Sequence, residues 1–255
     1  MTSQGENMKE TVVVITGASS GIGAALAELL GSRGASLVLA ARRIEPLQAV
    51  AARCGKNALA VTADVTRRED VRRVRDEALA RFGRIDVWVN NAGQGITRVP
   101  SALTDEDIDQ MVLQNVKSAL YGMQEVLPHF RERNAGHVIN VSSLLGRNPY
   151  VMPRAAYSGA KHFLNALTAN FRMEVQQTHP GIRFSLVSPG VVATDFGLNA
   201  RHGGNDSRSF PDAQPVAEVA AVIAGVIESK RPDVYTRRGA RERILNYYST
   251  LAEDP

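Results

Sequence analysis

Short apolar runs alternate along the chain with longer segments that mix apolar and charged residues. The first run, residues 11–16, reads Thr-Val-Val-Val-Ile-Thr without an interrupting charge. A continuous run of β-branched residues is typical of a strand that is buried on both faces of a parallel sheet. Six further runs predict strands at 36–40, 58–61, 85–89, 137–141, 183–187 and 234–236.

The segments between these runs have the spacing of amphipathic helices. They are 24–33, 46–53, 67–77, 104–127, 157–177, 215–229 and 241–251. The fifth of them has a broad apolar stripe, formed by Phe163, Leu164, Leu167, Phe171 and Val175. Strands that alternate with helices predict a doubly wound α/β fold of the Rossmann type, in which ligands bind at the carboxyl ends of parallel strands.

The composition favours one catalytic domain, residues 1–255. Hydrophobic residues make up 44% of the chain and charged residues 22%, and no Pro/Gly/Ser-rich linker divides it. No apolar run reaches the ~18 to 20 residues that cross a bilayer, so we expect a soluble, cytoplasmic protein without a membrane segment. Residues 1–9 are polar and predict a flexible tail, and Cys54, the only cysteine, fits a reducing compartment.

The net charge of +4 raises the question of a nucleic-acid partner. In the densest cluster, residues 67–77, four-residue spacing predicts ion pairs of Glu69 with Arg73, Arg72 with Asp76, and Arg73 with Glu77. These pairs indicate a solvated helix face, so we expect no nucleic-acid partner. A second, less balanced cluster leaves contact with a partner or an acidic ligand open; it comprises Arg237, Arg238, Arg241 and Arg243.

A glycine-rich turn joins the first predicted strand to the first helix: Gly17-Ala18-Ser19-Ser20-Gly21-Ile22-Gly23. In this arrangement backbone N–H groups and the positive end of a helix face an anion, typically a pyrophosphate, and glycines let the backbone approach it. No Lys-Ser/Thr pair follows as in a P-loop, so mononucleotide hydrolysis is disfavoured. The alternative is a turn that only packs helix on strand.

Arg42 and Arg43 follow the second predicted strand. An NAD-selective site places an acidic residue there to hold the adenosine ribose hydroxyls. Two guanidinium groups would instead neutralise a 2′-phosphate through charge-assisted hydrogen bonds. We therefore expect NADP(H) as the cofactor; the alternative is a pair of exposed arginines with no ligand.

Tyr157 and Lys161 lie four residues apart at the start of a predicted helix and therefore share one face. A free phenol ionises near pH ~10, so its use as an acid or base near pH ~7 requires roughly 4 kcal/mol of extra stabilisation of the phenolate. A neighbouring ammonium is a source of that stabilisation. Ser142 and Ser143 reach the same sheet edge from the preceding strand.

Two polar features fall within the fourth predicted helix. Thr104 followed by Asp107 predicts a capping box at the helix start, not a metal or acid–base cluster. Asn115 lies mid-helix, where asparagine is a poor helix former, which points to a functional role. The five histidines lack the spacing of metal ligands, so we expect no metal site; His202 is the one histidine that we place near substrate.

These motifs, in this order, resemble those of the short-chain dehydrogenase/reductases, in their classical branch. The residues that carry the resemblance are 16–23, 90–93, Tyr157, Lys161 and Pro189-Gly190. The resemblance implies a seven-stranded parallel sheet, a nicotinamide cofactor and a catalytic set of Ser143, Tyr157 and Lys161 supported by Asn115. It implies cofactor contacts from Gly17, Ser19, Ser20, Gly21, Ile22, Gly23, Arg42, Arg43, Asp64, Val65, Asn91, Ala92, Gly93, Tyr157, Lys161, Pro189, Gly190, Val192 and Thr194.

The position of the serine departs from the family pattern. The family places its serine thirteen residues before the tyrosine, and Leu144 stands there in this chain. Ser143 lies fourteen residues before Tyr157, and its Ser143-x-x-Gly146 context is similar to that of the family. A one-residue insertion within 147–153 accounts for the shift, and Ser142 is the alternative.

The resemblance implies reversible hydride transfer between NADP(H) and a ketone or secondary alcohol. Tyr157 would give a proton to the carbonyl oxygen, and Ser143 would hydrogen-bond the same oxygen. Lys161 would lower the pKa of Tyr157, and Asn115 would anchor a water beside Lys161. Two alternatives remain: a non-catalytic NADP-binding sensor or structural subunit, and a sugar-nucleotide epimerase or dehydratase.

A small-molecule carbonyl or alcohol substrate is expected to contact Ser143, Tyr157, Gln94 and Met152. Residues 196–214 form a long segment without periodicity beside the sixth predicted strand and predict a substrate lid. The resemblance also implies a homodimer or homotetramer, formed through the helices that begin near Thr104 and Tyr157.

Overall fold

Seven parallel strands form the centre of the molecule in the computed structural model, which describes residues 8–251. The strands are β1 (Val12–Thr16), β2 (Ser36–Ala41), β3 (Ala58–Thr62), β4 (Val87–Asn90), β5 (Gly136–Val141), β6 (Ile182–Ser188) and β7 (Asp233–Tyr235). Their order across the sheet is β3-β2-β1-β4-β5-β6-β7, and every neighbouring pair is parallel. The predicted doubly wound α/β fold is thereby confirmed.

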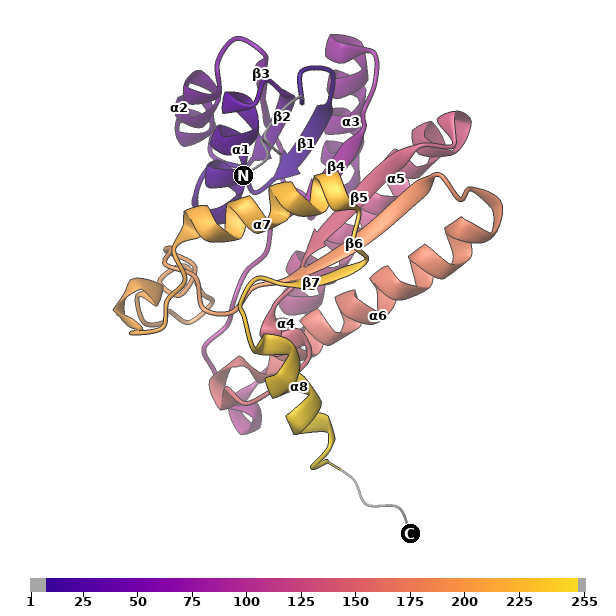
Figure 1. Ribbon diagram of the computed structural model, residues 1–255. Helices are drawn as coiled ribbons and strands as arrows, with labels where there is room; N and C mark the ends of the chain where they lie inside the picture. Colours follow the sequence, from indigo (N-terminus) through magenta and orange to yellow (C-terminus); the bar gives the residue numbers. More distant parts are fainter. Residues whose placement is uncertain (1–7, 252–255) are drawn as a thin grey trace.

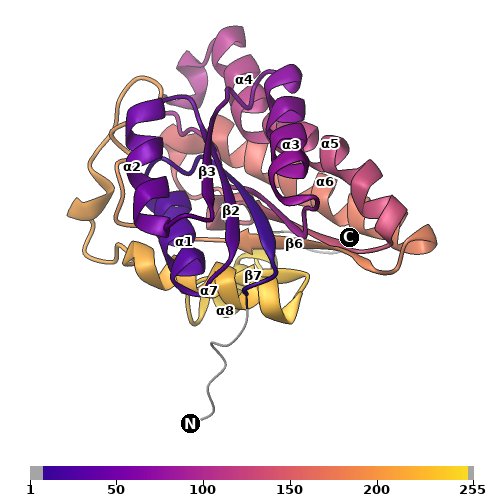
Figure 2. The same cartoon turned by 90° about the horizontal axis from the view of Figure 1, so that it is seen from above.

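Helices cover both faces of the sheet (Figures 1 and 2). One face packs against α1 (Gly21–Ser32), α2 (Ile44–Cys54) and α7 (Val216–Ser229). The other packs against α3 (Arg68–Phe82), α5 (Ser118–Arg133) and α6 (Ala155–Thr178). Two short helices complete the fold: α4 (Asp105–Val112) leads into α5, and α8 (Ala240–Tyr248) extends away from the sheet at the bottom of Figure 1.

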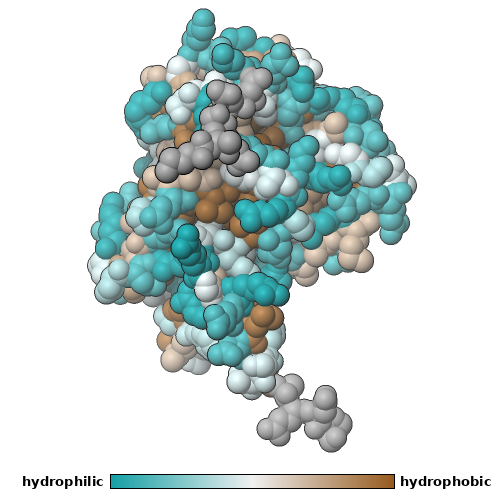
Figure 3. All heavy atoms as spheres, viewed as in Figure 1, coloured by the Kyte–Doolittle hydropathy of each residue, from teal (hydrophilic) through white to brown (hydrophobic). Residues whose placement is uncertain are grey.

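The burial of β1 explains why its sequence is continuously apolar. Val13 and Ile15 belong to the core beneath α1, α2 and α7, whereas Val14 belongs to the core on the opposite face. Successive side chains of a strand point to opposite faces, so a strand covered on both sides needs apolar residues at every position. The outer surface is mostly hydrophilic, as Figure 3 shows for one side of the molecule.

The helix predicted at 104–127 differs from the structure in two ways. A π-helix at Leu113–Lys117 interrupts it, and α5 then continues through Pro128 to Arg133. Proline normally ends or kinks a helix. Here Phe130, which is fully buried, anchors the last turn, so tertiary packing offsets the missing N–H.

Two of the three ion pairs predicted within 67–77 are wrong. Only Arg73 and Glu77 meet as expected, at 3.6 Å. Arg72 pairs instead with Glu125 of α5, and Glu69 pairs with Arg67. Glu125 is buried and also accepts from Arg68 and Arg75. The arginines of α3 therefore bind α3 to α5 instead of only facing solvent. Spacing within 67–77 could not predict this, because Glu125 lies about 50 residues further along the chain.

Of the tail predicted at 1–9, residues 1–7 lie outside the described residues. Met8 is buried in the core beneath α1, and its carbonyl accepts a hydrogen bond from Thr11 N. Within residues 8–251, none of the helices combines the length and the hydropathy that a membrane crossing requires.

Candidate active site

The glycine turn after β1 is shaped by close backbone packing. Gly17 has a φ of 66°, a conformation that favours glycine, and a Cβ there would lie 2.8 Å from the Cα of Ala92. A Cβ on Gly23 would lie 2.4 Å from the carbonyl oxygen of Gly17. Both positions therefore require glycine for the loop to fold as it does.

The N-terminus of α1 opens toward the carboxyl edge of the sheet with its N–H groups uncapped. Ser20 is the N-cap residue, yet its side chain makes no capping hydrogen bond, and the first turn contains no acidic residue. Thr194 lies across from this turn, with its Cγ2 3.3 Å from the position of a Cβ on Gly21. Ser19 and Ile22 are half-buried beside it. Free donors and a positive helix end fit a phosphate group.

Arg42 and Arg43 are exposed directly after β2, at the same edge. Asp64 and Val65 follow β3 and are half-buried. The Asp64 carboxylate already accepts hydrogen bonds from the N–H and hydroxyl of Thr66, at 3.0 and 2.8 Å. Among residues 8–251, Arg42 and Arg43 therefore have no ion-pair partner, whereas the Asp64 carboxylate is already hydrogen-bonded.

The segment after β4 joins the glycine turn to the catalytic candidates. Asn91 donates to the carbonyl oxygens of Thr16 and Gly17, at 3.0 and 3.2 Å, and so holds the start of the glycine turn in place. A Cβ on Gly93 would lie 2.8 Å from Asn115 Oδ1 and 3.5 Å from Lys161 Nζ. Gly93 therefore lies between these two side chains.

Asn115 occupies the π-helix that interrupts the predicted helix, and its side chain is buried. Its Nδ2 donates to the carbonyl oxygens of Gln94 and Met111, at 2.9 and 3.1 Å, and its Oδ1 accepts from Gln94 N at 3.2 Å. π-Helical turns inside α-helices occur frequently at functional sites. The local distortion explains how an asparagine is accommodated mid-helix, and it ties this helix to the segment after β4.

The two serines after β5 have different partners. Ser142 donates its hydroxyl hydrogen to Asn165 Oδ1 at 2.5 Å, so it is engaged with α6. Ser143 accepts from Leu145 N at 3.1 Å, and its hydroxyl lies near enough to the Tyr157 phenol to oppose the rise in the pKa of Tyr157. Of the two, Ser143 is the serine that faces the phenol.

Tyr157 and Lys161 are both buried near the start of α6, and Lys161 Nζ lies 5.6 Å from the centre of the Tyr157 ring. Nζ donates to the carbonyl oxygen of Val141 at 3.0 Å. Burial lowers the pKa of Lys161 to about 8 and raises the pKa of Tyr157 to about 12. The groups that oppose the rise in the pKa of Tyr157 are the Ser143 hydroxyl and the Arg154 guanidinium, and the Lys161 ammonium is directed to Val141 O.

The segment after β6 closes the other side of the edge. Pro189 is buried and accepts from Leu144 N at 2.7 Å, which links it to the serine loop. A Cβ on Gly190 would lie 2.8 Å from Arg237 Nε. Val192 packs into the core, and Thr194 returns over α1. Arg237 also donates to Val191 O, so one member of the C-terminal arginine cluster holds this segment in place.

The two predicted substrate residues have unequal positions. Gln94 is half-buried and its Nε2 donates to Asn199 O, at 3.3 Å, which joins it to the segment 196–214. Met152 is 63% exposed and lies at the rim. Phe196, from the same segment, packs against Tyr157 with ring centres 5.5 Å apart. The predicted lid therefore reaches the phenol.

Two charged features were missed by the sequence analysis. Arg154, three residues before Tyr157, was not singled out because one arginine in a loop carries no pattern. Asp107 does form the predicted capping box with Thr104, but it is also fully buried and binds Arg201 and His202 of the segment 196–214, at 2.6 and 2.7 Å. His202 is thus engaged with this carboxylate.

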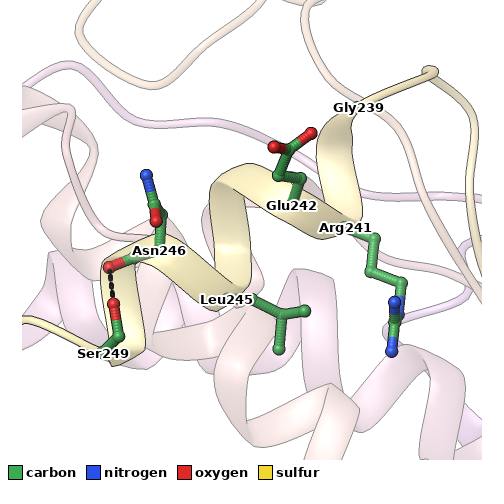
Figure 4. A pocket seen from close by; sticks show the side chains of 6 residues that line it. All are labelled: Gly239, Arg241, Glu242, Leu245, Asn246 and Ser249. Atoms are coloured by element: carbon green, nitrogen blue, oxygen red, sulfur yellow. Dashed lines mark hydrogen bonds between the residues drawn. The ribbon is translucent and has the colours of Figure 1, made fainter.

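One surface hollow, of about 550 Å³, lies along α8 and its flanks (Figure 4). It is lined by Gly239, Arg241, Glu242, Leu245, Asn246 and Ser249. None of the candidate catalytic or cofactor-binding residues lines it, although Arg241 of the C-terminal arginine cluster does. A hollow of about 290 Å³ lies instead between the start of α1 and Thr194, at the glycine turn. Among residues 8–251, no three His, Cys, Asp or Glu side chains are grouped so that they could share a metal ion.

Comparisons of the sequence with known proteins agree on one family. The family model described as short chain dehydrogenase matches residues 11–204. An uncharacterized oxidoreductase of Staphylococcus saprophyticus is 39% identical over 192 residues, which cover 74% of this chain and 77% of that protein.

Solved structures agree. A short-chain dehydrogenase from Sphingobium yanoikuyae in complex with NADPH is 28% identical, with a TM-score of 0.81 over 96% of this chain and 97% of that one. A 3-ketoacyl-(acyl-carrier-protein) reductase from Brucella melitensis complexed with NADH is 26% identical, with a TM-score of 0.80 over 91% and 99%.

Proposed function

Because the chain belongs to the short-chain dehydrogenase family, we propose that it transfers hydride reversibly between NADP(H) and a ketone or secondary alcohol, with Tyr157 as the general acid and base. The observation that carries this proposal is the grouping of Ser143, Tyr157 and Lys161 at one sheet edge. The uncapped start of α1 at the same edge fits a phosphate-bearing cofactor.

The cofactor supplies or accepts the hydride at the carbonyl carbon. The Ser143 hydroxyl would orient the carbonyl oxygen by a hydrogen bond, and Tyr157 would donate its phenolic proton to that oxygen. The raised pKa of Tyr157 keeps the phenol protonated at neutral pH, which suits the reductive direction. Lys161 would hold the cofactor ribose, and Asn115 would fix the segment after β4 and the water beside Lys161.

The preference for NADP(H) rests on Arg42 and Arg43, which are exposed at the end of β2 and have no ion-pair partner in the part of the chain that the structure describes. One similar structure contains NADPH and another contains NADH. Similarity to these structures therefore supports a nicotinamide dinucleotide as the cofactor, and the two arginines support NADP(H) over NAD(H). The lid 196–214 would cover the substrate, since Phe196 packs on Tyr157.

A homodimer or homotetramer accompanies this proposal. Phe163 and Met173 of α6 are 53% and 65% exposed, an apolar surface that a second copy would cover. Light scattering of the purified protein at several concentrations tests this association.

The decisive experiment measures NADPH and NADH oxidation with a panel of ketones, quinones, steroids, sugars and acyl thioesters. Consumption of NADPH with a subset of these carbonyls is the expected result. Binding of NADPH without turnover of any carbonyl would favour a cofactor-binding sensor or structural subunit. A tightly held cofactor that is not consumed during turnover of a sugar nucleotide would favour the epimerase or dehydratase chemistry.

A further inference from the structure

Asp107 binds two separate parts of the chain through its two carboxylate oxygens. The side chain is fully buried near the start of α4. Oδ2 accepts from Thr104 N at 3.2 Å, within the capping box, and from Arg98 Nη1 at 3.0 Å. Oδ1 accepts from Arg201 Nε at 2.6 Å and from His202 Nε2 at 2.7 Å. A capping box needs only one carboxylate oxygen, so it does not explain the contacts of Oδ1.

The contacts of Oδ1 join charged groups away from water. Hydrogen bonds from a guanidinium to a carboxylate are short and stronger than those between neutral groups. Burial raises the pKa of Asp107, but hydrogen bonds from Arg201 and His202 outweigh this effect and hold the pKa below its usual range. The carboxylate is therefore ionised at neutral pH, and the loss of a partner would leave a buried charge unsatisfied. We call the two hydrogen bonds of Oδ1 the Asp107 anchor.

Arg201 belongs to the segment 196–214 and is also held by its backbone. Arg201 N donates to Gly95 O at 2.9 Å, and Thr97 N donates to Arg201 O at 3.0 Å. These two bonds form a short parallel bridge with the segment that follows β4. The side chain of Arg201 therefore binds the segment 196–214 to α4, and its backbone binds the same segment to the chain after β4.

The Asp107 anchor lies close in sequence to the aromatic contact with the phenol. Phe196, from the same segment as Arg201, packs on Tyr157 with ring centres 5.5 Å apart. His202 has a φ of 65°, a conformation that is unfavourable for a residue other than glycine, and its hydrogen bond to Asp107 stabilises the chain there. Release of Arg201 and His202 would therefore free Phe196 to move away from Tyr157.

A neighbouring acid faces the same arginine but is placed differently. Glu106, also in the first turn of α4, lies 3.9 Å from Arg201, and its side chain is 60% exposed. Exposed ion pairs contribute little to stability, because water screens the charges. Asp107 therefore holds Arg201 more strongly than Glu106 does, and Glu106 provides a matched control.

We propose that Asp107 is the positioning residue of the substrate lid, 196–214, and that the Asp107 anchor keeps Phe196 against Tyr157. This inference rests on the proposed function, in which the lid covers the substrate. Asp107 acts through the lid and not on the reacting atoms. A substrate binds to the fraction of the protein in which the lid is in place, so loss of the anchor lowers that fraction and weakens substrate binding.

Hydrogen exchange followed by mass spectrometry tests the anchor without any substrate. In Asp107→Asn the amides of residues 196–214 should exchange about 10- to 100-fold faster, the range expected for lost charge-assisted hydrogen bonds. Glu106→Gln removes the same charge from the neighbouring residue and should leave this exchange unchanged. Thr104→Ala removes the hydrogen bond that Asp107 N donates to Thr104 Oγ1, and it should speed exchange only at the start of α4.

A double-mutant cycle determines whether Asp107 acts through Arg201. Arg201→Gln alone should also speed exchange in residues 196–214, and its combination with Asp107→Asn should have less effect than the product of the two single changes. Multiplicative effects would show that the two side chains act independently and would overturn the inference. Unchanged exchange of residues 196–214 in Asp107→Asn would overturn it as well.

Steady-state kinetics with a carbonyl compound that the unmodified protein reduces test the consequence for the site. Asp107→Asn should raise KM for that compound about 10-fold or more, while kcat and the dissociation constant of NADPH stay within about twofold. A lower kcat with an unchanged KM would contradict the positioning role. If the unmodified protein reduces no carbonyl compound, the proposed function fails, and the exchange measurements still decide whether Asp107 anchors the segment 196–214.

Discussion

The proposed site has two sides, which we call the cofactor side and the substrate side, and they are built in different ways. The cofactor side consists of the glycine turn, the start of α1 and the exposed ends of β2 and β3, and it relies on backbone geometry such as the contact of Gly23 with Gly17 O. The substrate side consists of the loop 143–154, the start of α6 and the lid, and it relies on side chains such as Asp107, Arg154 and Phe196, which come from separate segments.

The two sides differ in how much they reduce the stability of the folded protein. Donors at a helix start face solvent until a ligand binds, so the cofactor side costs the fold little. The substrate side buries a phenol, an ammonium and a guanidinium. Burial raises the pKa of the Tyr157 phenol and lowers the pKa of Lys161 and of Arg154, so it favours the neutral form of each group. Variants on the substrate side should therefore change catalysis and stability in opposite directions, whereas variants on the cofactor side should mainly change affinity.

The largest expected effect is on catalysis at Tyr157. Tyr157→Phe removes the proton donor and retains the ring that packs on Phe196. Turnover of any active carbonyl should fall about 1000-fold, the size of a lost general acid, while the dissociation constant of NADPH stays within about twofold. Steady-state kinetics and fluorescence titration measure the two quantities. Turnover at the unmodified rate would remove Tyr157 from the mechanism.

Lys161→Met should show the stability cost of the substrate side. The lysine has a pKa of about 8 in the folded protein and 10.5 as a free group, so the unfolded chain binds more protons between these values and stability rises with pH across that window. Below about pH 8 the full cost of burying the charge is present. The variant should therefore be more stable at pH 7 by about 3 kcal/mol and lose activity.

Urea unfolding at pH 7 and pH 10 checks this prediction. The difference in the free energy of unfolding between the unmodified protein and the variant should be smaller at pH 10 than at pH 7. An unchanged gap would mean that the ammonium is not destabilised by burial.

On the cofactor side, replacing both Arg42 and Arg43 by Ser should weaken NADPH binding by about 10- to 100-fold, because charge-assisted hydrogen bonds to the 2′-phosphate are lost. NADH lacks that phosphate and serves as the internal control, with an affinity that should not change. Loss of affinity for both cofactors to the same degree, measured by titration, would refute selectivity at this position.

The smallest effects compare two glycines. Gly23→Ala should destabilise the fold by about 1–3 kcal/mol and weaken NADPH binding, because the added methyl group meets Gly17 O at 2.4 Å. Gly225→Ala in α7 meets nothing within 4 Å and should stabilise the helix by about 0.5–1 kcal/mol. Thermal unfolding measures both, and equal effects would show that the glycine turn is not constrained by packing.

Much of the cofactor side could be predicted because its signals are local. A strand followed by a glycine turn and a helix is contiguous, and so is Arg42-Arg43 after β2. The pairing of Tyr157 with Lys161 was also visible, since four-residue spacing puts two side chains on one helix face. The hydrogen bond from Lys161 to the carbonyl oxygen of Val141 could not be predicted, because Val141 lies on another element.

The sequence by itself determined the order of strands and helices along the chain, the glycine turn, and the identity of the side chains at the carboxyl edge of the sheet. Their types follow from short-range rules of periodicity and backbone conformation. Tertiary structure alone decided that Ser143 and not Ser142 faces Tyr157, that Asn115 lies in a π-helix, and that Arg154 has no carboxylate partner within residues 8–251. These outcomes depend on contacts between segments tens of residues apart, which spacing along the chain does not encode.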